Sequence, residues 1–405
     1  MNLLVYMTGG FDRHGPSNHL FATLIEDFLR KGHEVVLVER YSGGPNPIIP
    51  NTLTIYKGFS YHCVNVKVID KQKLIRRYFN SVKYAFKSRK TLKKIFVEKK
   101  IDVVLIQSNP TPYFQLRSVR KFFKGNVVFN IQDFFPGSSI ATGKMNNKLM
   151  QNFFYWFSRL AYKMADYFTV ISTDSKRLLV EQGVDPNRIE VIANWYNSEE
   201  VKEIPWDKNK FVSKYELAKG PFYVQYAGGM GFVFDYKAIV NAAKTLIDYK
   251  DIVFLMVGDG SQKNDFVSLA EKNNLTNIHF FPMQPQEIVA DVYSTCELQI
   301  IPLNKKVIGN SVPSKAGLLM SCNRLILNSV DSDSDYFKLF NEEKIGVSVS
   351  NDDNDALAKS ILHFYNNRES MKEIVARANE FGRKFYSREV ATGKYIYFFT
   401  NISDK

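Results

Sequence analysis

The sequence is poor in cysteine and has no long uninterrupted apolar segment. Its three cysteines, Cys63, Cys296 and Cys322, are odd in number and form no CxxC or Cys/His cluster, which argues against a disulfide framework or a zinc site. The most apolar stretch, 153–171, contains three charged residues, and the apolar opening is too short for a signal peptide. We therefore expect a cytoplasmic protein without a transmembrane helix.

The sequence also shows no sign of extensive disorder or of low-complexity tracts. Apolar residues make up 45% of the chain, aromatic residues 14% and charged residues 23%, as in a well-packed globular protein. At about 100 to 200 residues per domain, 405 residues predict two or three domains.

The net charge of +13 is divided unevenly along the chain. Residues 1–195 hold 29 Lys and Arg against 14 Asp and Glu, whereas the remainder holds 25 against 27. Within 67–100, 13 basic residues face two acidic ones and alternate with aromatic residues. This pattern predicts a basic helical surface with aromatic anchors that binds an anionic membrane. A nucleic-acid partner is not expected, because no recognised binding motif accompanies the charge.

Strand-like and helix-like segments alternate through both halves of the chain. The first series starts with a strand at 3–7 and a helix at 17–31, and a second series starts at 222–227 after a polar linker around 194–219. This alternation is typical of an α/β fold with a parallel sheet covered on both faces. We predict two doubly wound, Rossmann-like domains at 1–196 and 197–375, followed by C-terminal helices at 376–405 that return to the first domain.

Glycine-rich turns follow three of the predicted strands. Such turns let backbone N–H groups approach anions or sugar hydroxyls at the carboxyl edge of a sheet, although glycine also serves ordinary tight turns. None has the GxGxxG spacing of a dinucleotide site. The glycines in question are Gly9, Gly10 and Gly15 in the first half, and Gly228, Gly229, Gly231, Gly258 and Gly260 in the second.

Other polar residues also lie at strand ends. Lys315 and Ser314 lie at the start of an apolar helix, where a cation opposes the helix dipole unless an anion lies in front of it. Gln132 and Asp133 follow the strand at 127–131, where Asp133 is either a site residue or a turn former. No acidic or histidine pair has convincing metal-ligand spacing, so neither a metal nor another cofactor is predicted.

Seven segments resemble glycosyltransferase family 4, the two-domain GT-B fold, and in particular its bacterial members that build capsule, O-antigen and exopolysaccharide. They occur in the family's order and spacing: HLFATLIEDFLRKGHEVVLV, FNIQDFFPGSSIATGKMNN, ADYFTVISTDSKRLLVEQGVDPNRIEVIANWYN, YAGGMG, FLMVGDG, VYSTCELQIIPL and SVPSKAGLLMSCNRLILNSVDSDSD. The resemblance implies two domains facing each other across a cleft. It also implies metal-independent transfer of a sugar, with retention, from a nucleotide sugar to an acceptor.

The resemblance assigns roles to particular residues. As catalytic residues it suggests Asp133, Lys315 and Asp335. The donor, with UDP as the expected nucleotide, would be bound by Gly228, Gly229, Gly231, Gly258, Asp259, Met283, Lys305, Asn310, Ser311 and Ser314. The acceptor, a polyprenyl-diphosphate-linked sugar or an oligosaccharide, would be bound by Gly9, Gly10, His14, Gly15 and Ser17 at the inner face of the cell membrane.

The sequence departs from the family at several positions. The family's paired glutamates fall on Asn310 and Leu318, and Gln132 replaces a common histidine. Two alternatives therefore stay open, a weakened GT-B binding subunit and a nucleotide-sugar epimerase of the same fold. The epimerase is the less favoured of the two, because His and Glu are scarce in the second-domain motifs.

Overall fold

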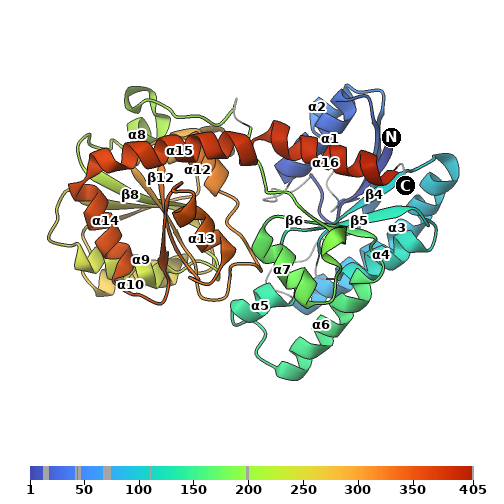
Figure 1. Ribbon diagram of the computed structural model, residues 1–405, viewed down its shortest axis with the longest axis horizontal. Coiled ribbons are helices and arrows are strands. Elements are labelled where there is room, and N and C mark those ends of the chain that lie inside the picture. The colour runs from blue at the N-terminus through green and yellow to red at the C-terminus, as the bar shows by residue number, and fades with distance from the viewer. Residues whose placement is uncertain are drawn as a thin grey trace. The chain divides into compact units, whose positions relative to one another are not determined.

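The computed structural model describes residues 1–11, 18–41, 43, 47–66, 74–109, 111–197 and 200–403, without the side chains of 74–77. Within these ranges the chain divides into two compact units (Figure 1). The first unit comprises 1–140, 145–193 and 391–405, and the second comprises 141–144 and 194–390. The predicted site residues His14, Gly15 and Ser17, and part of the basic segment 67–100, lie outside the described residues.

The first unit is built on a seven-stranded parallel sheet in the order β3-β2-β1-β4-β5-β6-β7. Its strands are β1 (Asn2–Tyr6), β2 (Glu34–Tyr41), β3 (Phe59–Asn65), β4 (Val103–Gln107), β5 (Asn126–Ile131), β6 (Tyr167–Val170) and β7 (Ile189–Val191). Its helices are α1 (Asn18–Arg30), α2 (Asn51–Thr54), α3 (Leu74–Glu98), α4 (Pro112–Arg120), α5 (Gly137–Ala141), α6 (Lys148–Tyr162), α7 (Thr173–Glu181) and most of α16 (Arg388–Ser403).

Helices pack on both sides of this sheet. Leu4 and Tyr6 of β1 belong to the core that also contains Tyr84 of α3 and Leu116 of α4. Phe28 of α1 instead packs on Phe399 of α16, with ring centroids 5.7 Å apart. The near-continuous apolar strands are thus buried on both faces, as the sequence predicts for a parallel sheet.

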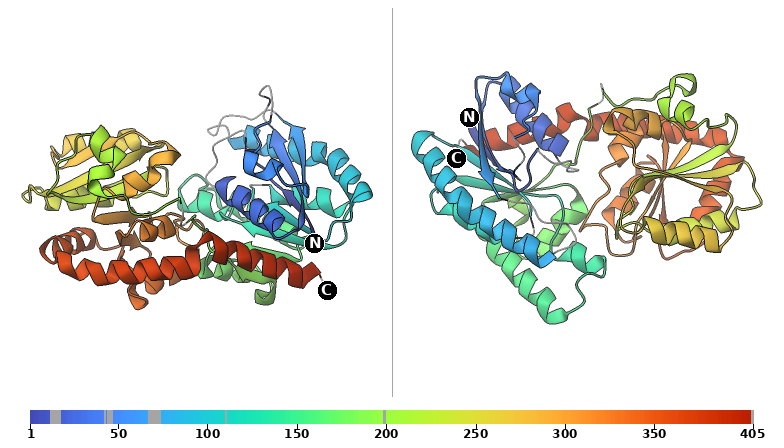
Figure 2. Two further views of the ribbon diagram at one scale, coloured as in Figure 1. Left: turned by 90° about the horizontal axis from the view of Figure 1, so that it is seen from above. Right: turned by 180° about the vertical axis from the view of Figure 1, so that it is seen from behind.

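The second unit has a six-stranded parallel sheet in the order β10-β9-β8-β11-β12-β13. Its strands are β8 (Phe222–Gly229), β9 (Ile252–Asp259), β10 (Ile278–Phe281), β11 (Leu298–Pro302), β12 (Leu325–Val330) and β13 (Val347–Ser350). Its helices are α8 (Lys210–Lys214), α9 (Tyr236–Thr245), α10 (Lys263–Lys272), α11 (Val289–Tyr293), α12 (Ala316–Ser321), α13 (Asp335–Glu342), α14 (Ala356–Asn366) and α15 (Arg368–Tyr386). Figure 2 shows the helices on both faces of each sheet.

Both sheets reverse their strand order at the same place. The chain moves outward from β1 in one direction and resumes beside it with β4, and β8 and β11 repeat this arrangement in the second unit. At such a switch point the loops leaving the two central strands diverge to opposite sides, which opens a crevice at the carboxyl ends of the strands. The topology therefore predicts one ligand-binding edge per unit, between β1 and β4 and between β8 and β11.

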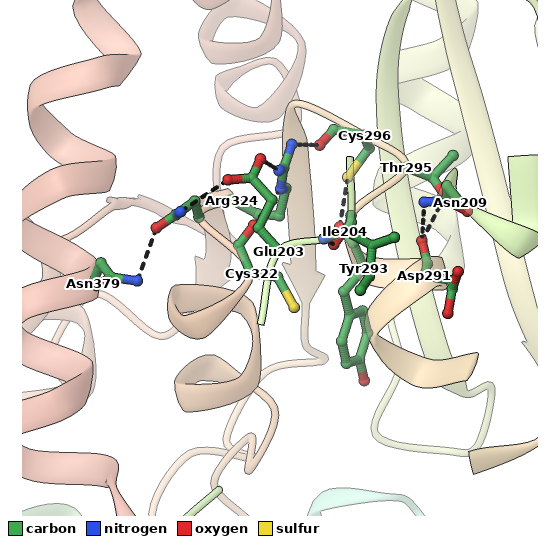
Figure 3. A network of polar contacts seen from close by, with 12 residues as sticks. Glu203, Ile204, Asn209, Asp291, Tyr293, Thr295, Cys296, Cys322, Arg324 and Asn379 are labelled. Atoms are coloured by element: carbon green, nitrogen blue, oxygen red, sulfur yellow. Dashed lines mark hydrogen bonds and ion pairs between the residues drawn. The ribbon is translucent and has the colours of Figure 1, made fainter. Parts of the chain in front are cut away.

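The segment expected to be a linker, 194–219, packs as part of the second unit (Figure 3). The Asn209 side chain donates to the Asp291 carbonyl at 2.7 Å, and the Ile204 N–H donates to Ser294 Oγ at 2.9 Å. Glu203 pairs with Arg324, whose guanidinium also donates to the Cys296 carbonyl. Its polar composition suggested a linker, but these polar groups bind the segment to the domain that follows.

Candidate active site

A cavity of about 300 Å³ lies at the carboxyl ends of β8 and β11, at the switch point of the second sheet. Its walls come from the end of β8, the end of β11, the loop that leads into α12 and the first turn of that helix, with one residue, Tyr293, from α11. The predicted donor residues Gly228, Gly229, Ser311 and Ser314 line it, as does Lys315. Residues nearly 90 positions apart in the chain thus meet around one space, as a ligand site requires.

Lys315 brings a cation to this cavity, and within the described part of the chain no carboxylate is paired with it. Its Nζ donates to the Ala227 carbonyl at 3.1 Å and lies 3.7 Å from the centroid of the Tyr226 ring. Burial lowers the pKa of Lys315 to about 7, and no carboxylate contributes to the shift. A buried ammonium is costly unless it is paired, so an anionic ligand beside Nζ would remove much of that cost.

Gly228 and Gly229, predicted to form a turn after the strand, are the last two residues of β8, and Gly228 lies directly against this ammonium. Gly228 has φ +148°, and a Cβ at this position would stand 3.4 Å from Lys315 Nζ. Glycine therefore serves two needs here, a backbone conformation that other residues rarely adopt and space next to the cation. Gly229 has open space around the position of a Cβ, which leaves its backbone accessible to a ligand.

The second glycine turn has a structural reason of its own. A Cβ on Gly258 would lie 2.0 Å from the Gly228 carbonyl oxygen, and one on Gly260 would lie 2.4 Å from Met230 backbone atoms. The Met230 N–H donates to the Asp259 carbonyl at 2.8 Å, which joins the two turns. Gly258 and Gly260 are thus required for the β9 turn to pack against the β8 turn, whether or not they also contact a ligand.

The remaining predicted donor residues are not among those that line the cavity. Lys305 forms an exposed ion pair with Asp352, and the Asn310 side chain donates to the Lys306 carbonyl at 3.3 Å. Met283 is 51% exposed in the loop after β10, Gly231 lies in the loop after β8, and Asp259 is the last residue of β9. Their contacts with a donor stay predictions.

Asp335 is the first residue of α13 and follows the N-cap Ser334, whose Oγ accepts from the Phe337 N–H at 3.1 Å. It does not line the cavity, and its role toward a sugar stays a prediction. Leu318, where the family has a glutamate, does line the cavity, so an apolar side chain occupies that part of the wall.

Tyr226 is a site residue that sequence reasoning missed. Its hydroxyl donates to the Gly229 carbonyl at 2.7 Å, and its ring packs 4.2 Å from that of Phe234 and lies under Lys315 Nζ. The ring face stabilises a nearby cation while the hydroxyl fixes the glycine turn. The only signal in the sequence was an aromatic residue two positions before the paired glycines.

In the first unit, the turn after β1 is held by two buried side chains. Gln107 Oε1, at the end of β4, accepts from the N–H groups of Thr8 and Gly9 at 3.1 and 3.4 Å. Glu39 Oε2 accepts from the Phe11 N–H at 3.0 Å. The turn is therefore fixed at the β1/β4 switch point, but the Gly9 N–H is engaged by protein, so an acceptor there would meet other groups of the turn. Acceptor binding by Gly9 and Gly10 stays a prediction.

Gln132 is oriented by a buried polar chain across the sheet. Its side-chain amide donates to Asn130 Oδ1 at 3.1 Å, and Asn130 Nδ2 donates to Thr169 Oγ1 and to the Tyr395 hydroxyl, each at 2.9 Å. The amide nitrogen of Gln132 is thereby engaged, and this leaves Oε1 as its acceptor. Asp133 next to it is exposed, and its catalytic role stays a prediction.

Among the described residues, no three or more His, Cys, Asp or Glu side chains are arranged to hold a metal ion. In the same part of the chain, no helix combines the length and apolar character needed to cross a membrane.

Comparisons with known proteins agree with this architecture. Residues 17–200 match the family model of Glycosyltransferase Family 4, and residues 207–381 match that of Glycosyl transferases group 1. The chain is 24% identical over 335 residues to a protein named probable glycosyltransferase WbjE from Pseudomonas aeruginosa, covering 80% of this chain and 82% of that protein.

Two solved structures share the fold at low identity. Sucrose-phosphate synthase from Thermosynechococcus elongatus superposes with a TM-score of 0.75 at 14% identity, covering 99% of both chains. HepE from Anabaena, solved in complex with UDP and glucose, gives a TM-score of 0.73 at 12% identity, covering 99% of this chain and 100% of that one. The two family models, together with the two Rossmann-like sheets, show that the chain is a GT-B glycosyltransferase with a family 4 domain followed by a group 1 domain.

Proposed function

We propose that this glycosyltransferase moves a hexosyl group from a UDP-sugar to a lipid-linked or oligosaccharide acceptor in bacterial surface polysaccharide synthesis. The observation that carries the donor half is Lys315, a partly buried cation at the switch point that lies against Gly228 and has no acidic partner among the described residues. A diphosphate supplies the missing negative charge and accepts hydrogen bonds from bare backbone. HepE, which shares the fold, was solved with UDP.

In the proposed reaction the acceptor hydroxyl attacks the anomeric carbon and the bond from that carbon to the diphosphate oxygen breaks. The hydroxyl proton passes to the departing diphosphate, and the configuration is retained. Lys315 and the turn at Gly228 and Gly229 stabilise the charge that develops on the leaving group, so that no metal is needed. Asp335 would bind sugar hydroxyls, and Asp133 would be the polar group near the reacting carbon.

The acceptor half rests on the first unit and on its charge. The fixed turn at Gly9 and Gly10 would receive the acceptor, and the basic segment 67–100 would hold the enzyme at the anionic inner face of the membrane. WbjE, which matches this chain over 335 residues, carries the name of a probable glycosyltransferase.

Nucleotide binding tests the donor half. We expect thermal unfolding of the purified chain to shift upward with UDP, and less with GDP, CDP or ADP, equally with magnesium or with EDTA. At about 100 times its dissociation constant, a nucleotide adds about 2.7 kcal/mol to the free energy of unfolding. Loss of the shift in Lys315→Ala, with the control Lys244→Ala unchanged, would support the site. A shift that requires magnesium would contradict the metal-free mechanism.

One observation favours a second candidate, a GT-B subunit that binds nucleotide sugar without transferring it. Leu318 puts an apolar side chain in the cavity wall where the family has a carboxylate. Binding of UDP-sugar with no transfer to any lipid-linked or oligosaccharide acceptor would support this candidate. Formation of glycosylated acceptor would exclude it, and conversion of the nucleotide sugar without any acceptor would indicate an epimerase.

A further inference from the structure

The outer surface of α6 carries large apolar side chains in a line. Leu149, Phe153 and Trp156 are 81%, 54% and 52% exposed, and Met150 beside them is 43% exposed. Their spacing of four and three residues places Leu149, Phe153 and Trp156 on one side of the helix. Single exposed apolar residues are common on soluble proteins, but a contiguous line of them marks an interaction surface.

This line continues across the neighbouring helices. The ring of Phe153 packs on Phe157 with centroids 6.1 Å apart, Phe157 packs on Phe114 of α4 at 5.6 Å, and Phe114 packs on Phe86 of α3 at 6.1 Å. Phe86 is itself 48% exposed. Helices α3, α4 and α6 lie side by side (Figure 1), so their exposed aromatic residues belong to one face, here called the aromatic face.

The same three helices are strongly basic. Eight Lys and Arg lie in α3 and two in each of α4 and α6, against Glu98 as their single acidic residue. On α3, exposed Phe79, Lys83, Phe86 and Lys90 follow one another at helical spacing, so that apolar and cationic side chains alternate along one stripe.

These features fit an anionic lipid layer better than the other large partners. A second copy of the chain would place one strongly basic face against another, which Coulomb repulsion opposes. Single-stranded nucleic acid is bound where stacking rings follow a basic groove. On α6, the apolar but non-aromatic Leu149 and Met150 instead accompany the tryptophan. Aliphatic and aromatic side chains with flanking lysines are the composition that partitions into the headgroup and acyl boundary.

We propose that α3, α4 and α6 form one docking face for an anionic membrane, in which Leu149, Phe153 and Trp156 enter the lipid while the lysines of α3 contact its phosphates. This inference rests on the proposed lipid-linked acceptor and extends the basic segment 67–100 by adding an inserting element. Electrostatic attraction brings the face to the membrane, and the apolar line of α6 then holds it there when salt screens the charges.

Binding of the full chain to vesicles tests the proposal. The probes are vesicles of phosphatidylcholine alone or with about a third phosphatidylglycerol, at low salt and at 0.5 M salt, a concentration at which exposed charges are screened beyond about 5 Å. Trp156 reports insertion, because Trp195 is 7% exposed and Trp206 is stacked on Tyr223. We expect its emission to shift to the blue, and acyl-brominated lipid to quench it, only with the anionic vesicles.

Variants separate the two parts of the face. Phe153→Glu should lower the partition constant for anionic vesicles by about tenfold or more, because a charge replaces an inserted ring. Trp156→Phe should bind almost normally but lose most of the fluorescence change. The matched control is Ile55→Glu, at an apolar residue that is 75% exposed after α2 and outside this face. Unchanged thermal unfolding and UDP binding in each variant exclude misfolding.

Each outcome decides a separate part of the proposal. Wild-type binding by Phe153→Glu, together with loss of binding in Lys83→Glu with Lys90→Glu, would refute insertion and leave the basic surface standing. Absence of vesicle binding by the wild type would refute the membrane face while UDP binding keeps the transferase proposal intact. A wild-type dimer that Phe153→Glu dissociates, without lipid binding, would assign the face to a second copy and overturn the inference.

Discussion

If Lys315 contacts the nucleotide as proposed, binding should depend on pH, and the lowered pKa of this lysine gives the direction of the dependence. In the empty site, burial lowers the pKa of Lys315 to about 7 from its ordinary value of 10.5. At pH 8 about nine-tenths of the empty molecules therefore carry a neutral Lys315. A diphosphate beside Nζ favours the charged form and returns the pKa toward its ordinary value, so binding must take up a proton.

The uptake can be worked out from these values. At pH 8 the expected uptake is about 0.9 proton per UDP, and at pH 6.5 it falls to about 0.2, because most of the lysine is already charged. Between pH 7 and pH 9 the affinity should fall by roughly fifty-fold, approaching tenfold per pH unit at the upper end. The nucleotide contributes little above pH 8, where its terminal phosphate, with a pKa near 6, is already ionised.

Calorimetry in buffers of different ionisation enthalpy measures this uptake directly, as the slope of the observed enthalpy against the buffer enthalpy. Lys315→Arg is the matched variant, because arginine stays charged and should bind UDP with no uptake at pH 8. Wild-type binding without proton uptake would refute the reasoning. An equal uptake in Lys315→Arg would place the titrating group elsewhere.

Further predictions concern stability. Gly258→Ala should lower the free energy of unfolding by about 2 kcal/mol or more, since its Cβ would overlap the Gly228 carbonyl. Gly393→Ala, with open space in α16, should raise it by about 0.5–1 kcal/mol. Urea unfolding of both variants checks the contrast, which would fail if both changed alike. Lys315→Met should stabilise the empty protein by about 1–2 kcal/mol at pH 7 while abolishing its UDP shift, because the buried ammonium is lost; lower stability in thermal unfolding would contradict this. Tyr395→Phe should lower the free energy of unfolding by about 1 kcal/mol, because it removes a hydrogen-bond acceptor of Asn130. Urea unfolding measures this loss, and an unchanged free energy would contradict the prediction.

The Lys315 stability effect has a definite sign with pH. Its pKa is lowered in the folded state, so the unfolded chain binds more protons between about pH 7 and pH 10.5. The contribution of this residue to stability therefore rises with pH across that window. Lys315→Met should lose this rise, and thermal unfolding of the empty protein at several pH values measures the difference.

Much of the fold was predictable because parallel strands buried on both faces are recognisable as short apolar runs. The runs at 103–107, 127–131 and 298–301 are strands β4, β5 and β11. Strand β3 was missed because it lies at the edge of its sheet and most of its side chains are partly exposed, which gives no apolar run. The predicted helical anchors of 67–100 include Tyr84, but this residue is fully buried and donates to the Met7 carbonyl, so it cannot face a membrane.

Residues of the candidate site could be predicted from the sequence only where a glycine or a charged residue follows a recognisable strand. The turn at Gly228 and Gly229 and the cation of Lys315 were found by that rule, and they do meet at one cavity. Tyr226 and Gln107 were missed, because nothing local distinguishes them from other residues at the end of a buried strand. Their roles come from what they contact, the ammonium in one case and the backbone of the β1 turn in the other.

The sequence by itself determined the fold class, the position of the two sheets along the chain and the family, because hydrophobic periodicity and strand-end glycines are local properties. Only the tertiary structure decided which of those glycines border a cavity and which, like Gly258, are required for packing. It also decided that Lys315 is partly buried with no acidic partner among the described residues, and that exposed apolar residues of α6 continue those of α3. Burial and contact between distant segments are properties of the folded chain, since they depend on which neighbours exclude water from a side chain.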